Sequence, residues 1–393
     1  MISAIHLLLF AVGLPAMAAC LYLLAMTLLS AELPLPPPSS RHLRFDIIVP
    51  AHNEAAVIER TVRSLCRIDW PQDRFRVLVV ADNCQDNTAM LARAAGAEVL
   101  ERSDTSRRGK GYALNFAFDA SRLAGRADAV VVIDADAEVT PNLLEACAAR
   151  IERGAQAVQV HYGVLNPFAS WRTRLITIAK ASFHIVRSRA RERLGVSCGI
   201  RGNGWCVTHE LLRQVPYQAY SLTEDLEFGI ELGLAGHRVH FAEEARSDAE
   251  MVSGGEAADQ QRQRWEGGRF QLIRSKTLPL LQAALQRRSA VCADLALDLL
   301  VLPLSYVALN VIAFATLAAI ANLAFPAAAM WLWPALVCGA ALALYVLRGW
   351  QLSGIGAQGV LDLARAPFFL AWKVLLLLRR QKSTEWVRTE RER

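Results

Sequence analysis

The strongest constraint on the fold of this chain is the uneven distribution of its charged residues. Residues 1–30 and 299–347 contain no Lys, Arg, Asp or Glu, although the chain carries 43 basic and 37 acidic residues elsewhere. About 20 apolar residues in a helix are enough to cross a bilayer, so the first run predicts one membrane helix. The second run is too long for one helix. Pro326 and Pro334 flank two tryptophans near its middle, which indicates two helices that meet at a membrane interface. The pattern excludes a fully soluble or disordered protein.

Residues 1–30 also allow a second interpretation, a cleaved signal peptide, because small residues follow Pro15. A signal peptide has a basic n-region and an apolar core of about 7–15 residues. This run has no basic residue and is longer than such a core. The sequence therefore favours a retained anchor.

Basic residues beside the apolar runs predict the orientation of the chain. Arg41 and Arg44 follow the first run, and Arg287 and Arg288 precede the second. Lys and Arg concentrate on the cytoplasmic side, so we expect a multi-pass protein of the cell (inner) membrane with its charged domain in the cytoplasm. The net charge is +6, and residues 348–393 hold nine basic and four acidic residues. Anionic membrane lipid is therefore a more suitable partner than nucleic acid.

Composition divides the chain into segments. The predicted segments are a transmembrane anchor (1–30), a Pro-rich linker (31–44), a globular domain (45–255), an interfacial helix (256–290), two transmembrane helices (291–325 and 326–348) and a basic interfacial segment (349–393). Residues 168–194 combine an apolar stripe with seven basic residues, which is typical of an amphipathic helix that lies on lipid or on the domain. Residues 352–378 are apolar but interrupted by charges, so they either lie at the interface or form a fourth crossing.

Strand and helix patterns alternate within residues 45–255. Four short apolar runs, each followed by a helical pattern, are predicted strands: Phe45–Val49, Arg76–Ala81, Ala97–Leu100 and Ala129–Ile133. This alternation predicts an α/β fold with a doubly wound, mostly parallel sheet. Ligands of such sheets bind at the carboxyl ends of the strands, so we expect the chemistry there.

Acidic groups follow three of these strands. Glu54 comes after the first, Asp82 after the second and Asp134-Ala135-Asp136 after the fourth. An isolated Asp-x-Asp is more often a solvated turn than a site. Directly after a buried strand, two such carboxylates offer hard oxygen ligands to Mg²⁺ or Mn²⁺, which also bind a substrate diphosphate.

A lysine stands between two glycines in Gly109-Lys110-Gly111. Glycines beside a lysine let backbone and ammonium approach an anion closely. The segment is not a P-loop, so a kinase or ATPase function loses its main support. A helix start with basic surface residues explains the segment equally well.

Ser221-Leu222-Thr223-Glu224 predicts a capping box that opens a helix. Capping leaves the next residue, Asp225, unexplained. The helix dipole favours a carboxylate anion in the first turn, which suits a general base and also suits simple complementation of the dipole.

Gln261, Arg264 and Trp265 would share one face of a helix through their i, i+3 and i, i+4 spacing. Arginine binds a diphosphate bidentately, and tryptophan offers a flat face to a sugar ring or a lipid head group. The alternative is an interfacial helix, in which Arg and Trp are also typical.

Together these motifs resemble those of membrane-integrated, inverting family 2 glycosyltransferases, such as cellulose and hyaluronan synthases and ceramide glucosyltransferases. The resemblance rests on four motifs in this order: Asp82, Asp134-Ala135-Asp136, Thr223-Glu224-Asp225 and Gln261-x-x-Arg264-Trp265. It implies a GT-A fold. It also implies a nucleoside site (Pro50, Ala51, Glu54 and Asp82, beside Lys110), a contact to the nucleotide (Asp134), a site for Mg²⁺ or Mn²⁺ (Asp136 with Asp134), a catalytic base (Asp225) and a diphosphate and acceptor site (Glu224, Gln261, Arg264 and Trp265).

The resemblance further implies transfer of a sugar from a nucleoside diphosphate sugar, with UDP as the expected nucleotide, to a hydroxyl of a lipid-linked or polysaccharide acceptor at the cytosolic membrane face. A processive synthase that also exports its polymer, with other polysaccharide-assembly proteins as partners, is the alternative within this class. A sugar-nucleotide or lipid-binding scaffold would not need Asp225. A transporter would need charged groups within its membrane segments, which have none.

Overall fold

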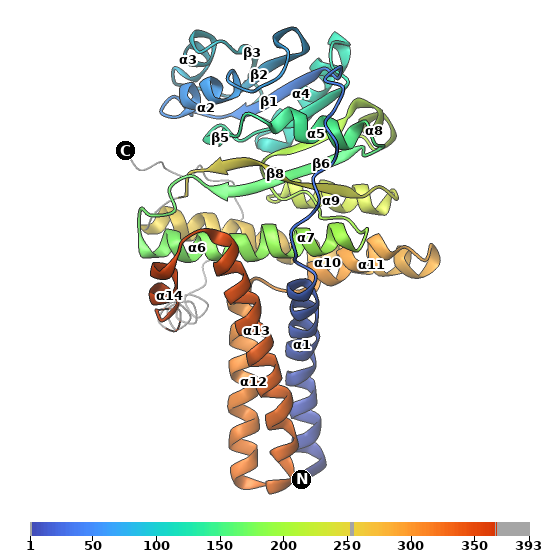
Figure 1. Cartoon of the computed structure of the whole chain (residues 1–393), viewed down its shortest axis with the longest axis vertical. Helices are drawn as coiled ribbons and strands as arrows, with labels where there is room; N and C mark the ends of the chain where they lie inside the picture. The colour runs from blue at the N-terminus through green and yellow to red at the C-terminus, as the bar shows by residue number, and fades with distance from the viewer. Residues whose placement is uncertain (1, 252–254, 366, 368–393) are drawn as a thin grey trace.

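The computed structural model describes residues 2–251, 255–365 and 367, and this part of the chain forms an α/β domain on a stem of helices (Figure 1). The strands are β1 (Phe45–Ala51), β2 (Phe75–Asp82), β3 (Glu98–Arg102), β4 (Ala129–Val132), β5 (Ala137–Val139), β6 (Ala157–Val164), β7 (Trp205–Thr208) and β8 (Val239–Ala249). The helical segments of the domain are α2 (Ile58–Leu65), η1 (Gln72–Arg74), α3 (Thr88–Ala94), α4 (Lys110–Ala124), α5 (Leu143–Ile151), α8 (His209–Gln214) and α9 (Glu224–Leu234). Those at its base and in the stem are α1 (Ile2–Leu28), α6 (Trp171–Ala181), η2 (Ser182–Val186), α7 (Arg187–Arg193), α10 (Gly255–Gln286), α11 (Ala290–Leu300), α12 (Leu304–Ala324), η3 (Pro326–Trp331), α13 (Leu332–Ser353) and α14 (Ala357–Leu363).

One sheet runs through the described part of the domain in the order β3-β2-β1-β4-β7-β6-β8-β5. Strands β1 to β4 pair in parallel, which confirms the predicted α/β fold. The sheet is more mixed than predicted, because β7 runs antiparallel to β4 and β6, and β5 runs antiparallel to β8. The turn before β7 lies at the carboxyl end of β4, where the Gly204 amide donates to the Val132 carbonyl (3.0 Å). From that position β7 must run back along β4.

Successive side chains of a strand point to opposite faces of the sheet, and both faces of this sheet are covered by apolar cores. On β1, Phe45, Ile47 and Val49 belong to the apolar core that includes α2 and α5, whereas Ile48 faces the core that includes α4, α8 and α9. Each of these side chains is at most 1% exposed. A strand that is buried on both faces has a continuous apolar sequence, which is the pattern that predicted β1, β2 and β4.

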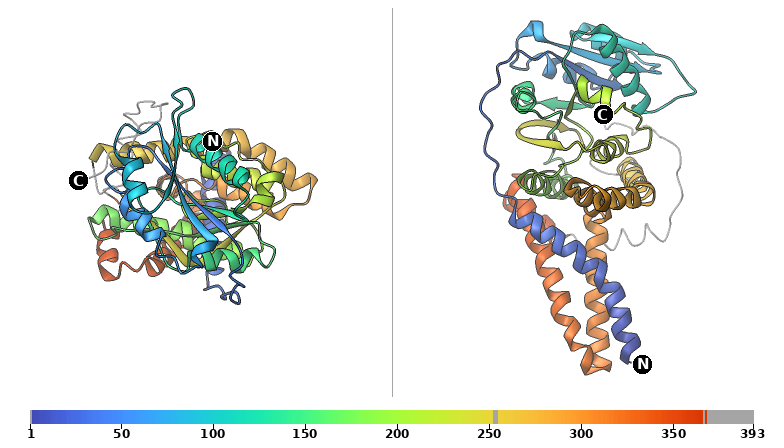
Figure 2. Two further views of the ribbon diagram at one scale, coloured as in Figure 1. Left: turned by 90° about the horizontal axis from the view of Figure 1, so that it is seen from above. Right: turned by 90° about the vertical axis from the view of Figure 1, so that its right-hand side faces the viewer.

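Three helices of the described chain are long and apolar enough to cross a membrane: Ala4–Leu28, Leu304–Ala324 and Pro326–Ser353, with mean hydropathies of 2.3, 2.0 and 1.9. This agrees with the three predicted membrane helices. They pack along one another below the domain, and the start of α1 lies at the same end of the stem as the turn between α12 and α13 (Figures 1 and 2). Gly13 permits close packing, since a Cβ there would lie 2.6 Å from the Phe314 ring.

The second membrane helix begins later than the predicted start at residue 291. Residues 290–300 form the separate helix α11, and α12 starts only after Pro303. Asp294 and Asp298 lie on α11, and charged residues are costly within a bilayer, so α11 suits the junction between stem and domain better than the membrane. At the other end α13 extends to Ser353, beyond the predicted limit at 348. Most of the predicted basic segment 349–393, including residues 368–378 of the ambiguous apolar stretch, lies outside the described residues.

The basic stretch 168–194 forms α6, the π-helical segment η2 and α7, which lie across the top of the stem (Figure 1). Several of its basic residues face protein instead of lipid. Arg187 pairs with Asp298 (3.1 Å), and Arg191 pairs with Asp294 (2.5 Å). These contacts join α7 to α11, so these two arginines contact another helix of the chain.

Candidate active site

A cavity of about 1710 Å³ lies along the carboxyl ends of β1, β2 and β4 and continues to the top of the stem. Pockets for one small ligand usually measure about 300–1000 Å³, so this cavity has room for more than one substrate. It is lined by every residue that the sequence singled out. These residues are Pro50, Ala51, Glu54, Asp82, Lys110, Asp134, Asp136, Glu224, Asp225, Gln261, Arg264 and Trp265. The structure brings them together, whereas their individual roles remain predictions.

Asparagines with a left-handed backbone build the turns after β1 and β2. Asn53 has φ 55° and Asn83 has φ 52°, a conformation that Asn adopts more readily than most residues. Asn53 Oδ1 accepts a hydrogen bond from the Gln85 amide (2.7 Å), and Asn83 Oδ1 accepts one from the Asp104 amide (2.8 Å). The side chains thus tie each turn to a neighbouring loop and fix the strand ends, including Asp82, at the cavity.

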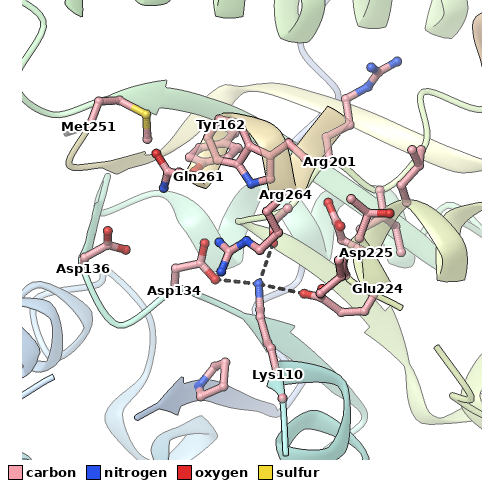
Figure 3. A pocket seen from close by; sticks show the side chains of 18 of the residues that line it. Lys110, Asp134, Asp136, Tyr162, Arg201, Glu224, Asp225, Met251, Gln261 and Arg264 are labelled. Atoms are coloured by element: carbon pink, nitrogen blue, oxygen red, sulfur yellow. Dashed lines mark hydrogen bonds and ion pairs between the residues drawn. The ribbon is translucent and has the colours of Figure 1, made fainter. Parts of the chain in front are cut away.

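Lys110, the first residue of α4, connects two acidic side chains and a backbone carbonyl of the site. Its Nζ donates to Asp134 Oδ1 (2.7 Å) and to the Gly202 carbonyl (3.2 Å), and it lies 3.4 Å from Glu224 Oε1 (Figure 3). Burial by itself lowers the pKa of a lysine, but the charges of Asp134, Glu224 and Asp225 outweigh this effect and hold the pKa of Lys110 above its usual value. Lys110 is therefore a permanent cation at the centre of the site.

The capping box predicted for residues 221–224 is wrong. Helix α9 begins at Glu224, and its N-cap residue Thr223 makes no side-chain capping bond. Glu224 at the first helical position points to Lys110, and the Ser221 amide donates instead to Glu227 Oε2 (3.0 Å). The later helix start places Glu224 in the site and leaves Asp225 in the first helical turn, as predicted.

The adjacent carboxyls of Glu224 and Asp225 both have raised pKa values. Burial raises the pKa of Glu224 to about 7, with Lys110 opposing this effect and Asp225 adding to it. Burial also raises the pKa of Asp225, and Lys110 again opposes it. A carboxylate with a raised pKa is a stronger proton acceptor near neutral pH. Gly202 packs closely against Asp225, because a Cβ at Gly202 would lie 3.4 Å from Asp225 Oδ2.

Asp134 and Asp136 lie on a rigid turn after β4. The Asp134 amide donates to Asn203 Oδ1 (2.9 Å), and the Thr61 hydroxyl donates to the Ala135 carbonyl (2.7 Å). Hard carboxylate oxygens are suitable ligands for Mg²⁺ or Mn²⁺. No group of three or more His, Cys, Asp and Glu side chains gathers as a metal site among the described residues. Asp134 and Asp136 offer such oxygens, but these two carboxylates alone do not complete a metal site.

Helix α10 closes the cavity on the side opposite the strand ends. Gln261 and Arg264 are half-buried and Trp265 is 41% exposed, and all three line the cavity, as their spacing on one helix face predicted. Figure 3 shows Arg264 pointing toward the part of the cavity that holds Lys110 and Asp134. A guanidinium in this position can bind a diphosphate.

The cavity also has lining residues near the stem that no sequence motif singled out, among them Arg187, Arg201 and Arg269. One signal for Arg201 was available, the glycine-rich stretch 198–204. Three glycines there have a positive φ: Gly199 (76°), Gly202 (99°) and Gly204 (71°). Such glycines mark a turn that L side chains rarely adopt and that often approaches a ligand. Arg187 and Arg269 have no comparable local signal.

The sequence of this chain is similar to those of known proteins. The chain is 29% identical over 232 residues to the beta-monoglucosyldiacylglycerol synthase of Trichormus variabilis, a match that covers 57% of this chain and 48% of that protein. It is 30% identical over 135 residues to the cellulose synthase 1 catalytic subunit of Komagataeibacter xylinus, which covers 32% of this chain and 17% of that protein. The chain thus spans about half the length, or less, of these curated relatives.

A solved structure supports the fold over a larger part of the chain. The mannosyltransferase PcManGT of Pyrobaculum calidifontis, in complex with GDP-Man and Mn²⁺, aligns with a TM-score of 0.53 and 20% identity, covering 88% of this chain and 99% of that one. The likeness agrees with the GT-A fold that the motifs implied. The family model described as glycosyltransferase-like family 2 matches residues 42–268, more than half of the chain. On this evidence, the chain belongs to glycosyltransferase-like family 2.

Proposed function

We propose that the chain is an inverting glycosyltransferase that moves a sugar from a nucleoside diphosphate sugar to a hydroxyl of a lipid-linked or polysaccharide acceptor. The continuity of the cavity carries this proposal. One end lies at the strand ends, and the other is lined by residues of α12 and α13 such as Leu304 and Leu342. A water-soluble donor thus has access at one end and a membrane-bound acceptor at the other.

The donor would bind at the strand ends, with its nucleoside beside Pro50, Ala51, Glu54 and Asp82 and with UDP as the expected nucleotide. Asp134 and Asp136 would hold Mg²⁺ or Mn²⁺, which neutralises diphosphate charge when it is bound. The structure of PcManGT in complex with GDP-Man and Mn²⁺ supports this class of donor and cofactor.

Asp225 would accept the proton of the acceptor hydroxyl. The oxygen then forms its bond to the anomeric carbon while the bond between that carbon and the diphosphate oxygen breaks on the opposite face. The nucleoside diphosphate leaves with the electron pair of the broken bond, and the configuration of the sugar inverts. Lys110 and Arg264 would stabilise the charge on the departing diphosphate.

The reaction would take place at the cytosolic face of the cell membrane, with the N-terminus outside. This orientation rests on the basic residues beside the stem, such as Arg41 and Arg287. Cys66 is exposed on the domain. A membrane-impermeant thiol reagent applied to intact cells should leave Cys66 unlabelled, and should label it after the cells are opened. Labelling of Cys66 in intact cells would contradict the orientation.

The activity can be tested with the purified full-length protein in detergent. A panel of UDP- and GDP-sugars is incubated with lipid and glycan acceptors, and released nucleotide and product mass are measured. We expect acceptor-dependent nucleotide release and a product with one added sugar. A long polymer would favour the processive synthase instead, and the absence of turnover with every donor would contradict the proposal.

A further inference from the structure

Four buried arginines gather where the cavity meets the stem. They come from three separate parts of the chain: Arg187 and Arg191 on α7, Arg201 in the glycine-rich turn and Arg269 on α10. The residues are 3%, 0%, 6% and 9% exposed, respectively. Arg187, Arg201 and Arg269 line the cavity directly, whereas Arg191 lies behind them. We call this set the arginine cluster.

The arginine cluster carries more positive charge than its acidic neighbours compensate. Among the described residues its ion pairs are made with two carboxylates, Asp294 and Asp298. Burial and the neighbouring arginines lower the pKa of Arg269 to about 10, although Asp298 opposes them. Burial also lowers the pKa of Arg201. Buried charge without a partner is costly, so an excess of this kind points to an anionic ligand.

Of the four buried nitrogens of the arginine cluster that lack a hydrogen-bond partner in the described structure, two belong to Arg201 and the others are Arg191 Nη2 and Arg269 Nε. Neither Nη1 nor Nη2 of Arg201 makes a hydrogen bond within the described structure, and Nη2 lies 3.7 Å from Asp298 Oδ2. The guanidinium carbon lies 4.1 Å from the centre of the Phe183 ring, which fixes its plane. Buried polar groups are almost always hydrogen-bonded. Arg201 therefore places two buried donors without a hydrogen-bond partner in the wall of the cavity.

A purely structural role explains part of the arginine cluster. Arg187 donates to Tyr345 (2.9 Å) and to Asp298 (3.1 Å), and Arg191 contacts both acidic residues, so these two side chains join the domain to the stem. Such contacts do not account for the two unpaired terminal nitrogens of Arg201. Figure 3 shows Arg201 extending away from Lys110 and Asp134, so it does not serve the strand-end part of the site.

The wall beside the arginine cluster is apolar. Leu302 precedes α12, Leu304 and Ala308 lie on α12, and Leu342 and Val346 lie on α13, and all of them line the cavity. On the other side, Gly202 follows Arg201 directly and lies against Asp225. Along the cavity, the order is thus an apolar wall from the stem, a cationic group and then the proposed base.

From this order we propose that the arginine cluster binds the phosphate of a phospholipid acceptor whose head group carries a free hydroxyl. The acyl chains would lie against α12 and α13, the phosphate would accept hydrogen bonds from Arg201, and the hydroxyl would reach Asp225. Arginine is well suited to a phosphodiester because its donors match two oxygens at once. This inference names the acceptor class of the proposed function and rests on it.

The test compares three probes for the same site in neutral maltoside detergent. Dioctanoyl phosphatidylglycerol has chains, phosphate and hydroxyls, dioctanoylglycerol lacks the phosphate, and glycerol phosphate lacks the chains. We expect phosphatidylglycerol to bind the full-length protein at least tenfold more tightly than either of the others. Equal affinity for dioctanoylglycerol would overturn the phosphate site, and equal affinity for glycerol phosphate would overturn the lipid assignment.

Variants connect the preference to Arg201. Arg201→Gln should weaken phosphatidylglycerol binding at least tenfold and leave dioctanoylglycerol and UDP binding unchanged. Arg274→Gln is the matched control, because Arg274 is exposed on α10 and does not line this cavity, and it should change none of these affinities. If Arg201→Gln does not fold, Ala308→Phe, which narrows the apolar end, should weaken phosphatidylglycerol binding several-fold. An unchanged affinity in the folded variant would overturn the proposal.

The two proposals fail in different ways. A protein that prefers phosphatidylglycerol through Arg201 but turns over no sugar nucleotide would retain this site and contradict the transferase function. A protein that glycosylates dioctanoylglycerol as fast as phosphatidylglycerol would retain the transferase function and overturn the acceptor assignment.

Discussion

The two ends of the cavity differ in charge. At the strand ends, Lys110 and Arg264 lie near three carboxyl groups, those of Asp134, Glu224 and Asp225, with Asp136 also lining this part of the cavity. At the stem, four arginines face Asp294 and Asp298. The acidic end therefore suits a divalent cation with its diphosphate, and the basic end suits an anionic head group. The contrast supports our proposal that the two halves of one continuous cavity bind different substrates.

The largest expected effect comes from the residue between the two ends. Asp225→Asn keeps the size of the side chain but cannot accept a proton, and losing a positioned base typically lowers the rate by about 10²–10⁴-fold. UDP affinity and thermal stability should stay near wild type, since Asp225 is outside the proposed nucleoside site. Steady-state kinetics and isothermal titration calorimetry measure the two effects separately.

Asp82→Asn is the counterpart of Asp225→Asn at the donor end. The Asp82 carboxylate accepts a hydrogen bond from Arg102 Nη1 (2.5 Å) in the turn that lines the proposed nucleoside site. This variant should weaken UDP binding about tenfold.

For Asp225→Asn, transfer at close to the wild-type rate would show that Asp225 is only a charge at a helix terminus.

Metal removal should affect only the acidic end of the cavity. After exhaustive dialysis against EDTA we expect transfer to fall by about 10²-fold or more, because the diphosphate charge is then not neutralised. Added Mg²⁺ or Mn²⁺ should restore it, and binding of phosphatidylglycerol should not change throughout. Full turnover in excess EDTA would contradict the proposed role of Asp134 and Asp136 as metal ligands.

The pH dependence should change when the central cation is removed. Lys110 lowers the pKa values of both Asp225 and Glu224, so Lys110→Gln raises them further. The base must be deprotonated, and a higher pKa moves the loss of activity on the acid side to higher pH. Relative to wild type, the variant should lose about tenfold more activity at pH 6 than at pH 8.5. Arg107→Gln, which removes an exposed positive charge from the neighbouring loop, should leave the profile unchanged.

The donor end could be predicted from the sequence, and the stem end could not, for a physical reason. Asp82 and Asp134 follow continuous apolar runs, so a local pattern places them at the carboxyl ends of buried strands. The arginine cluster depends on pairs such as Arg187 with Asp298, which lie 111 residues apart in the chain. A basic amphipathic pattern does not show whether its arginines face lipid or a partner helix that is distant in sequence.

The start of α9 is a second feature that the local sequence pattern could not predict, because it depends on contacts between distant segments. The Ser-x-x-Glu pattern predicts capping from local spacing alone. The approach to α9 is instead held against α4, where a Cβ on Gly111 would lie 2.3 Å from the Ala219 carbonyl and the Tyr112 and Tyr220 rings stack at 4.4 Å. These contacts between distant segments accompany the shift of the helix start to Glu224, which brings that side chain into the site.

The smallest expected effect concerns the contact between α10 and the start of α9. Gly267 and Gly268 are adjacent on α10, but a Cβ on Gly268 would lie 2.6 Å from Thr223 Cγ2, whereas a Cβ on Gly267 would meet no atom of the described residues within 4 Å. Gly268→Ala should therefore push on Thr223 and displace Asp225, lowering the rate several-fold. Overpacking costs about 1–3 kcal/mol, which outweighs the gain of at most about 1 kcal/mol in helix propensity. Gly267→Ala should only stabilise the helix, by up to about 1 kcal/mol, with unchanged kinetics. Denaturant unfolding and transfer assays on both variants measure the difference, and equal behaviour of the pair would show that α10 does not position the base.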